Sequence, residues 1–289
     1  MFLFLFSTAG ISGPPAFGLG YGIFGGGGTG ANYVTDKYTY ATNAVVAGSV
    51  LSSSNGFIGA ASNYTFGLFA NGGSTKNTTK YTFSNQSVSG GSALLISKAA
   101  LTGFGNSTQC IFTGGSSSGS YSDKYIYSTE VVTTGGVIPY AWVNAAAVSN
   151  DTFGIIAAGG SSVTNTAKYV HATNVASVGT TLTTGAGEAG GIGNAIVGLI
   201  CGGYRINTAS TIVDKYTYSS NVITNGSALG LKGRGTGGTG NDIVGIIGGG
   251  YLSKYMDRYV YLSDVRVPCT TLTIERYGFT GISSQPGAF

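Results

Sequence analysis

The sequence has very little charge and almost none of the side chains that most enzymes use for catalysis. Charged residues make up 8% of the 289 residues, and there is one histidine, His171. A copper centre built from several imidazole ligands is therefore excluded. The ten acidic residues include no pair spaced for general acid–base work and no calcium-binding loop. We expect no catalytic residue, no metal and no cofactor, and we expect that the protein is not an enzyme.

Cysteine is equally scarce. Cys110, Cys201 and Cys269 cannot all pair with one another, and their spacings match no zinc motif. Cys110 and Cys201 lie within apolar runs, where a free cysteine behaves as a small hydrophobic side chain. We therefore interpret these two residues as part of a core.

The chain also lacks a hydrophobic run long enough for a membrane helix, which needs about 20 apolar residues. The opening run, Met1 to Phe6, is short, has no basic residues before it, and is followed by Pro14 and Pro15. We expect no membrane span and no cleaved signal peptide. An exposed apolar run of this kind would promote aggregation. We expect residues 1–17 to form an arm that is buried against this protein or a neighbour, with docking residues Phe2, Leu3, Phe4, Leu5 and Phe6.

Glycine and aromatic residues, by contrast, are abundant, with 51 Gly, 19 Tyr and 14 Phe. A Lys-Tyr pair, followed after one residue by an aromatic residue or histidine, occurs in six copies, the last of which has Arg258 in place of lysine. The first tyrosine of the copies returns every 43 to 47 residues, a period typical of repeat proteins. We expect these six tyrosines to be repeat-core residues: Tyr38, Tyr81, Tyr125, Tyr169, Tyr216 and Tyr259.

Each unit contains several strand signals and no helical one. A short apolar run that ends in glycines, such as Gly198–Gly203, is typical of a strand buried on both faces. The Lys-Tyr strand follows, and five residues after its first tyrosine a polar residue predicts a turn. A third strand is expected where Gly is followed by Leu or Ile, as in 48–51, 136–138 and 226–229. A fourth, with the weakest signal, is expected in the Gly- and Ala-rich segment between units.

Six units of about four short strands predict an all-β chain that closes into a ring, because closure removes unpaired sheet edges. The segment from Leu272 to Ile282 resembles an inter-unit segment, and no glycine-terminated run follows it. The first unit begins at Tyr21 and lacks that segment. We predict a six-bladed β-propeller over residues 18–289, closed by its N- and C-terminal segments.

The net charge of +4 is not evidence for nucleic-acid binding, because six of the 14 Lys and Arg residues occupy one repeat position. We therefore expect no nucleic-acid partner. His171 stands where most copies have the second aromatic residue, so packing is the expected role. The Asp that precedes several of the Lys-Tyr pairs, as at Asp36, is expected to make polar contacts between blades.

A Gly-Gly strand end followed about ten residues later by a Tyr strand resembles the kelch repeat. Kelch units carry a Trp shortly after that Tyr, whereas in this chain the position is polar and the only Trp is Trp142. The unit Asp-Lys-Tyr-x-Tyr-x-x-Asn is more similar to kelch-type repeats in virion and tail proteins of tailed phages.

This resemblance implies a structural component of a phage virion, in the tail, baseplate or capsid surface, with a contribution to host attachment. It implies multiple copies, other virion subunits as partners through the N-terminal arm, and host surface glycans as further partners. The alternative is a secreted or surface carbohydrate-binding, lectin-like β-propeller of a bacterium. An export signal would be required for the second function and not for the first.

Overall fold

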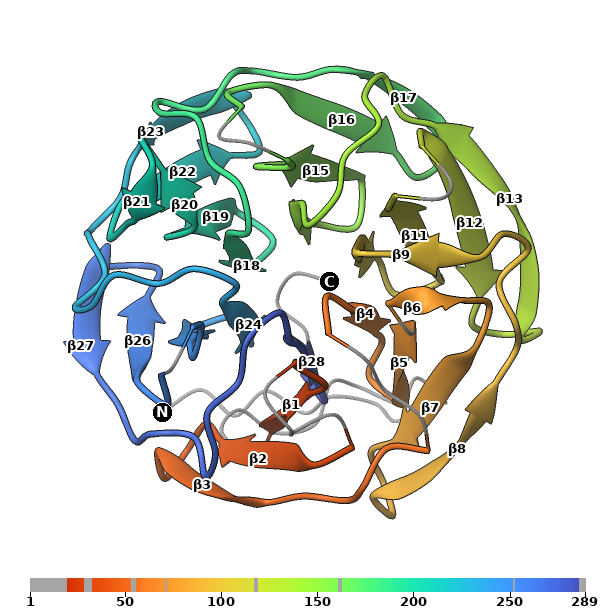
Figure 1. Cartoon of the computed structure of the whole chain (residues 1–289), viewed down its shortest axis with the longest axis horizontal. Helices are drawn as coiled ribbons and strands as arrows, with labels where there is room; N and C mark the ends of the chain where they lie inside the picture. The colour runs from red at the N-terminus through yellow and green to blue at the C-terminus, as the bar shows by residue number, and fades with distance from the viewer. Residues whose placement is uncertain are drawn as a thin grey trace, which may run out of the picture.

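The computed structural model describes residues 20–28, 33–52, 56–70, 72–116, 119–160, 163–251 and 253–285. These residues contain no helix and form six four-stranded antiparallel sheets, arranged as the blades of a six-bladed β-propeller (Figure 1). In each blade one strand lies nearest the axis of the ring and one lies at the rim. The predicted arm, with Phe2 to Phe6, lies outside the described residues.

In each blade, four strands follow one another from the axis to the rim. Blade 1 consists of β28 (Thr280–Ser283), β1 (Tyr21–Gly25), β2 (Thr35–Thr39) and β3 (Ala44–Ala47). Blade 2 consists of β4 (Gly59–Ser62), β5 (Phe66–Ala70), β7 (Thr78–Thr82) and β8 (Ser87–Gly91). Blade 3 consists of β10 (Leu101–Gly105), β11 (Gln109–Gly114), β12 (Tyr121–Ile126) and β13 (Val131–Val137). Blade 4 consists of β14 (Ala146–Ser149), β15 (Phe153–Ala157), β16 (Thr166–Val170) and β17 (Val175–Val178). Blade 5 consists of β18 (Gly190–Gly193), β19 (Val197–Cys201), β22 (Val213–Thr217) and β23 (Val222–Asn225). Blade 6 consists of β24 (Gly237–Gly240), β25 (Val244–Gly248), β26 (Met256–Val260) and β27 (Val265–Pro268). Two small two-stranded sheets pair β6 (Gly73–Thr75) with β9 (Lys98–Ala99), and β20 (Tyr204–Arg205) with β21 (Thr208–Ala209).

The two ends of the chain complete one blade together, as predicted from the sequence. Strand β28 pairs antiparallel with β1, so that Gly22 lies opposite Ser283 and Gly25 lies opposite Thr280. The C-terminal segment therefore supplies the innermost strand of the blade that holds the N-terminal strands (Figure 1). The ring closes by main-chain pairing.

The predicted third strand of the unit is the outermost strand of the blade, and in most blades it lies earlier in the chain than the sequence pattern predicts. The outermost strand begins directly after the turn, as in Ala44–Ala47, and Gly48 already follows it. In blade 3, where β13 has seven residues, the outermost strand does reach Gly136 and Val137. The Leu or Ile that ends the predicted segment is instead a buried anchor: Leu51 is 2% exposed and packs with Phe69 and Tyr81 of blade 2. The predicted fourth strand exists, but it is the innermost strand of the next blade.

The six repeat-core tyrosines are all buried, with exposed fractions of 2% or less. Each packs against the preceding blade, because alternate side chains of a strand point to the same face of the sheet. Tyr125 meets Phe66 of blade 2 edge to face at 6.3 Å, and Tyr216 meets Phe153 of blade 4 at 6.2 Å. These aromatic pairs lie between neighbouring sheets and hold the blades together.

The polar residue five positions after each of these tyrosines has a left-handed backbone, with φ between 54° and 56°. In four blades its side chain accepts a hydrogen bond from the tyrosine hydroxyl, as between Tyr38 and Asn43 (2.7 Å) and between Tyr216 and Asn221 (2.7 Å). This contact explains the constant spacing of five residues. In four blades the lysine before the tyrosine reaches the same turn of the next blade, as Lys168 Nζ donates to Asn221 Oδ1 at 2.6 Å.

His171 takes the place of the second aromatic residue in blade 4. It is 5% exposed, and its ring lies 6.0 Å from the ring of Phe104 and 5.9 Å from that of Tyr169. Burial lowers the pKa of its imidazole to about 4. The side chain is therefore neutral at pH 7 and packs as a small aromatic residue.

Candidate functional site

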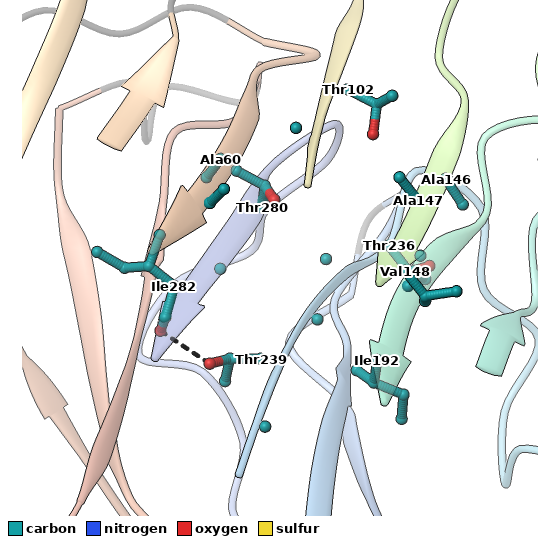
Figure 2. A pocket seen from close by; sticks show the side chains of 18 of the residues that line it. Ala60, Thr102, Ala146, Ala147, Val148, Ile192, Thr236, Thr239, Thr280 and Ile282 are labelled. Atoms are coloured by element: carbon teal, nitrogen blue, oxygen red, sulfur yellow. Dashed lines mark hydrogen bonds between the residues drawn. The ribbon is translucent and has the colours of Figure 1, made fainter. Parts of the chain in front are cut away.

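The six innermost strands surround a central channel with a cavity of about 110 Å³ (Figure 2). Its walls are made of small and hydroxyl-bearing residues such as Ala60, Thr102 and Thr239, and none of the described residues that line it is charged. Small residues are required because the strands converge around the axis. A Cβ on Gly191 would lie 2.1 Å from the carbonyl oxygen of Ala147 in the neighbouring blade. The described residues that line the channel offer no group for acid–base chemistry.

A ring of residues surrounds the end of the channel at which the innermost strands begin, which we call the upper mouth. Each blade contributes one residue just before its innermost strand, and all six have φ between 55° and 65°. Their backbones form a chain around the mouth. Gly235 N donates to Glu188 O (2.8 Å), Glu188 N donates to Asn144 O (3.2 Å), and three similar bonds connect other neighbours. The six residues are Phe57, Ala100, Asn144, Glu188, Gly235 and Gly278.

An ion pair lies on one side of this mouth. Arg234 Nε donates to Glu188 Oε2 at 2.7 Å, and Arg234 Nη2 donates to Glu188 Oε1 at 3.3 Å. The hydroxyl of Tyr277 donates to Glu188 Oε2 at 2.7 Å. Burial and this hydrogen bond to a carboxylate raise the pKa of Tyr277 to about 12, and the hydrogen bond to Glu188 raises the pKa of Arg234. At neutral pH the cluster therefore holds a guanidinium and a neutral phenol, both of which donate hydrogen bonds to Glu188.

Aromatic side chains extend the cluster along the mouth. The ring of Tyr277 lies between the rings of Phe57 and Tyr251 and is nearly perpendicular to both. The distance between ring centroids is 5.0 Å to Phe57 and 5.7 Å to Tyr251. The guanidinium of Arg234 lies over the ring of Tyr204 at 4.8 Å. Tyr251 is 65% exposed, and the side chain of Arg234 is 41% exposed. The cluster therefore presents one aromatic face and one charged group to solvent.

Blades 3 and 4 contribute smaller residues to the mouth. Ala100 and Asn144 occupy the positions in blades 3 and 4 that Glu188 occupies in blade 5. Beside Asn144 is a pocket of about 40 Å³, to which Glu188 and Thr236 also contribute. Asn144 Oδ1 and Thr236 Oγ1 are buried and accept or donate no hydrogen bond among the described residues. Two polar atoms without partners therefore lie at a pocket beside the cluster.

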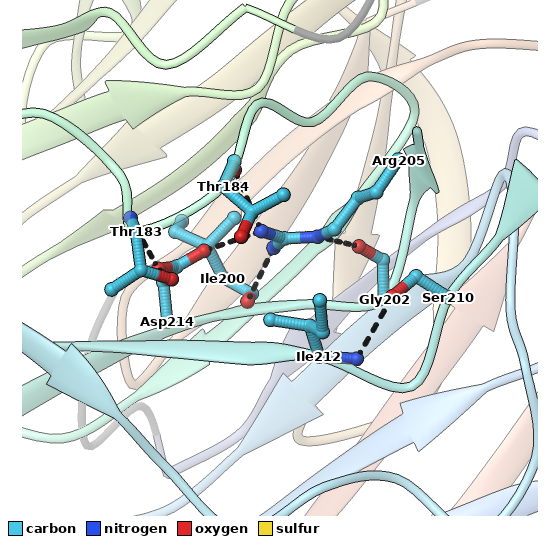
Figure 3. A network of polar contacts seen from close by, with 8 residues as sticks. All are labelled: Thr183, Thr184, Ile200, Gly202, Arg205, Ser210, Ile212 and Asp214. Atoms are coloured by element: carbon cyan, nitrogen blue, oxygen red, sulfur yellow. Dashed lines mark hydrogen bonds and ion pairs between the residues drawn. The ribbon is translucent and has the colours of Figure 1, made fainter. Parts of the chain in front are cut away.

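A buried ion pair fixes the hairpin that carries Tyr204. Arg205, which is 1% exposed, donates from Nη1 to Asp214 Oδ2 (2.6 Å) and from Nε to the carbonyl of Gly202 (2.8 Å) (Figure 3). Asp214 also accepts hydrogen bonds from the backbone and hydroxyl of Thr183. The β20–β21 hairpin is thus anchored in the blade, and Tyr204 is held beside Arg234.

The opposite end of the channel, which we call the lower mouth, is built from tight turns. The turn after the innermost strand begins with an asparagine whose side chain accepts two backbone N–H bonds, as Asn150 does from Thr152 (2.9 Å) and Phe153 (3.0 Å). Tyr64 lies in one of these turns and is 46% exposed. The side chain–backbone bonds explain why Asn recurs there. The long connections between strands lie at the upper mouth.

The residues singled out in the sequence are not those of this cluster. The six repeat-core tyrosines lie between blades, and Phe2 to Phe6 lie outside the described residues. In the sequence, Glu188 is one of several scattered acids, and Arg234 is part of a glycine-rich loop. One signal could have found them. The mouth positions follow the same period as the tyrosines, and Glu188 is the only charged residue among them.

No group of three or more His, Cys, Asp and Glu side chains is placed to hold a metal ion in the part of the chain that the structure describes. Within the same residues, no helix has the length and apolar character needed to cross a membrane.

No protein-family model matches the chain, and no curated protein matches it. Among solved structures, it is similar to the protein YjhT, with a TM-score of 0.65 and 9% identity over 78% of this chain and 87% of that one. It is also similar to a fungal alcohol oxidase of the AA5 family in complex with copper. That match has a TM-score of 0.56 and 11% identity over 90% of this chain and 66% of the oxidase. At these identities the likeness shows the fold alone.

The oxidase corrects one expectation from the sequence. We expected that the protein is not an enzyme, because catalytic side chains are scarce. An enzyme with a similar fold shows that this architecture is compatible with catalytic activity, so the fold gives no support to that expectation. The expectation is therefore withdrawn.

Proposed function

We propose that this protein is a kelch-like β-propeller of a phage virion, in the tail, baseplate or capsid surface, and that it contributes to host attachment through its upper mouth. The virion setting is supported by the repeated unit Asp-Lys-Tyr-x-Tyr-x-x-Asn, which resembles repeats of tailed-phage virion proteins. The attachment role is supported by the geometry of the mouth.

The observation that carries the proposal is the asymmetry of the mouth. A structural requirement would act on all six equivalent positions, because the blades repeat. Instead, Glu188, Arg234 and the exposed Tyr251 gather on one side, opposite Ala100.

The attachment role can be tested by competition. Purified protein should reduce adsorption of the phage to its host, because it occupies the same receptors. The Arg234→Ala variant should compete at least fivefold less well. Lys232→Ala is the matched control, since Lys232 is an exposed cation two residues away. If neither the wild-type protein nor any variant affects adsorption, the attachment role is wrong.

The virion setting assigns a role to the apolar arm, residues 1–17, as the anchor to other virion subunits. Burying Phe and Leu side chains contributes about 1.5–3 kcal/mol each, which can hold a subunit on a partner after ordering costs are met. A protein that lacks residues 2–12 should keep its thermal stability and fail to join the particle. Loss of most of the thermal stability of the ring would show instead that the arm belongs to the propeller.

The same mouth would also serve a lectin-like propeller secreted by a bacterium or held on its surface. Mass spectrometry of purified phage particles separates the two settings. The virion proposal requires the protein in several copies per particle. Its presence only in culture supernatant or on the cell surface would favour the bacterial lectin.

A further inference from the structure

We propose that the upper mouth binds a neutral pyranose residue of a glycan, with Tyr251 as the stacking platform and Arg234 and Asn144 as hydrogen-bonding groups. This inference rests on the proposed attachment role, because it names the ligand of the same site. It is carried by the charge balance of the mouth, its exposed aromatic face and its polar atoms without partners.

The charge balance favours a neutral ligand. The carboxylate of Glu188 accepts two hydrogen bonds from Arg234 and one from Tyr277. The guanidinium charge is thereby compensated within the cluster, and so is the carboxylate charge. A sugar acid would meet an arginine already paired with an anion, and an amino sugar would meet a carboxylate already paired with a cation. Each charged ligand would have to break the existing pair.

The aromatic face suits the apolar side of a sugar ring. A pyranose carries C–H groups on one face and hydroxyls around its edge, so it pairs with an amphipathic aromatic side chain. Tyr251 is 65% exposed, and its ring is held edge to face against Tyr277. Its backbone N–H also donates to the carbonyl of Arg234 at 3.0 Å. An exposed aromatic ring that is fixed in this way loses little freedom on binding.

The polar groups suit the hydroxyls around the ring. A guanidinium has five N–H donors, and two of those of Arg234 reach Glu188. Asn144 Oδ1 can accept a hydrogen bond from a hydroxyl and has no partner among the described residues. Recognition of a hydroxyl by polar atoms that are otherwise unpaired is selective, since they lose a bond when the hydroxyl is missing.

The pocket beside Asn144 is large enough for part of a hexose. One water needs about 10–15 Å³ on this measure of volume, and the pocket provides about 40 Å³. An exocyclic hydroxymethyl group fits such a space. The pocket is lined by Asn144 and Thr236, whose unpaired oxygens can bond to its hydroxyl. The site therefore favours a hexose over a pentose.

The test uses the full chain and saturation-transfer NMR with methyl hexopyranosides of glucose, galactose and mannose. Methyl xyloside, glucuronate and glucosamine serve as pentose, acidic and cationic comparisons. We expect at least one neutral hexoside to bind at least fivefold more tightly than the three comparison sugars. Tyr251→Ala should weaken that binding at least fivefold, and Asn144→Ala at least threefold. Tyr64→Ala is the matched control, because it removes an exposed tyrosine from the lower mouth.

Each other outcome overturns the inference. Binding of no sugar, tighter binding of the acid or the amine, or equal weakening by Tyr64→Ala would each show that the mouth is not a neutral-sugar site. Thermal unfolding of each variant separates loss of the site from loss of the fold. If no sugar binds while the protein still competes for phage adsorption, the inference fails and the proposed attachment role remains.

Discussion

Arg276 donates from Nε to Asp36 Oδ2 at 2.9 Å, and this ion pair joins the two ends of the chain. Both side chains are fully buried. Arg276 Nη1 also donates to the carbonyls of Gly26 (2.9 Å) and Val34 (2.8 Å), which flank strands of the N-terminal part of blade 1. One C-terminal side chain thus makes three contacts with N-terminal residues. The ion pair supplements the β28–β1 pairing that closes the ring.

Arg276→Met should destabilise the protein by about 3 kcal/mol. Removing one partner of a buried ion pair usually costs about 3–5 kcal/mol, and Asp36 keeps its hydrogen bonds from Thr273. Urea unfolding measures the change. Arg266→Met is the control, because Arg266 is half-buried and its nearest approach to Asp257 is 3.5 Å. A loss below about 1 kcal/mol for Arg276→Met, the size of a weak surface pair, would show that main-chain pairing alone closes the ring.

His171 should make the protein less stable in acid. Burial lowers its pKa from 6.5 to about 4 in the folded protein, so the unfolded chain binds the proton more readily. The stability contributed by the neutral imidazole is fully present above pH 6.5. It is lost as the pH falls from 6.5 towards 4. At about pH 4.5 the loss is on the order of 2 to 3 kcal/mol.

The His171→Tyr variant restores the aromatic residue that most copies have at this position, and it removes the titrating group. Urea unfolding at about pH 7 and about pH 4.5 should show a smaller loss of stability for the variant than for the wild-type protein. An identical loss in both proteins would assign the acid sensitivity to other groups.

Tyr125→Ala should cost at least about 3 kcal/mol, since replacing a buried aromatic residue with alanine usually costs about 3–5 kcal/mol. Tyr125 is fully buried and packs between blades 2 and 3. Tyr121 lies on the same strand, β12, and is 55% exposed, so Tyr121→Ala serves as the control. Equal thermal shifts for the two variants would contradict the assignment of Tyr125 to the core.

Glu188→Gln should change the ligand preference of the upper mouth. The substitution keeps the shape of the side chain and removes the charge that balances Arg234. We expect glucuronate to bind at least fivefold more tightly than it binds the wild-type protein, because the guanidinium becomes available to an anion. The pKa of Tyr277 should also fall, since its hydrogen bond to the carboxylate contributes to raising it. Spectroscopic titration of the phenols and sugar titrations check both results.

The sequence predicts the ring well, because its strongest features are periodic. The six tyrosines set the number of blades, and the incomplete first unit predicts the closure by the chain ends. The outermost strands are harder to place. They are four residues long in most blades and half-exposed, as at Val45, so they show no clear alternation. Gly48 follows the outer strand of blade 1, although the sequence pattern assigns it to that strand.

The site was missed because its members come together only after the ring is formed. Glu188 and Arg234 are 46 residues apart in sequence, and Glu188 and Tyr277 are 89 apart. Neither spacing resembles a known catalytic or binding motif. The useful signal is a departure from the repeat at one position, and it can be recognised only once the units are aligned on their tyrosines.

The pairing of β1 with β28 also has a consequence for synthesis on the ribosome. Strand β1 emerges before the other strands of the ring, and its inner edge remains without its partner until β28 has been translated, since Gly25 pairs with Thr280. An unpaired edge can accept a strand from another nascent chain. Because the six blades are built alike, such an exchange would link two polypeptides through a native-like sheet. Newly made chains on the same messenger RNA are therefore the population in which swapped dimers should first be found.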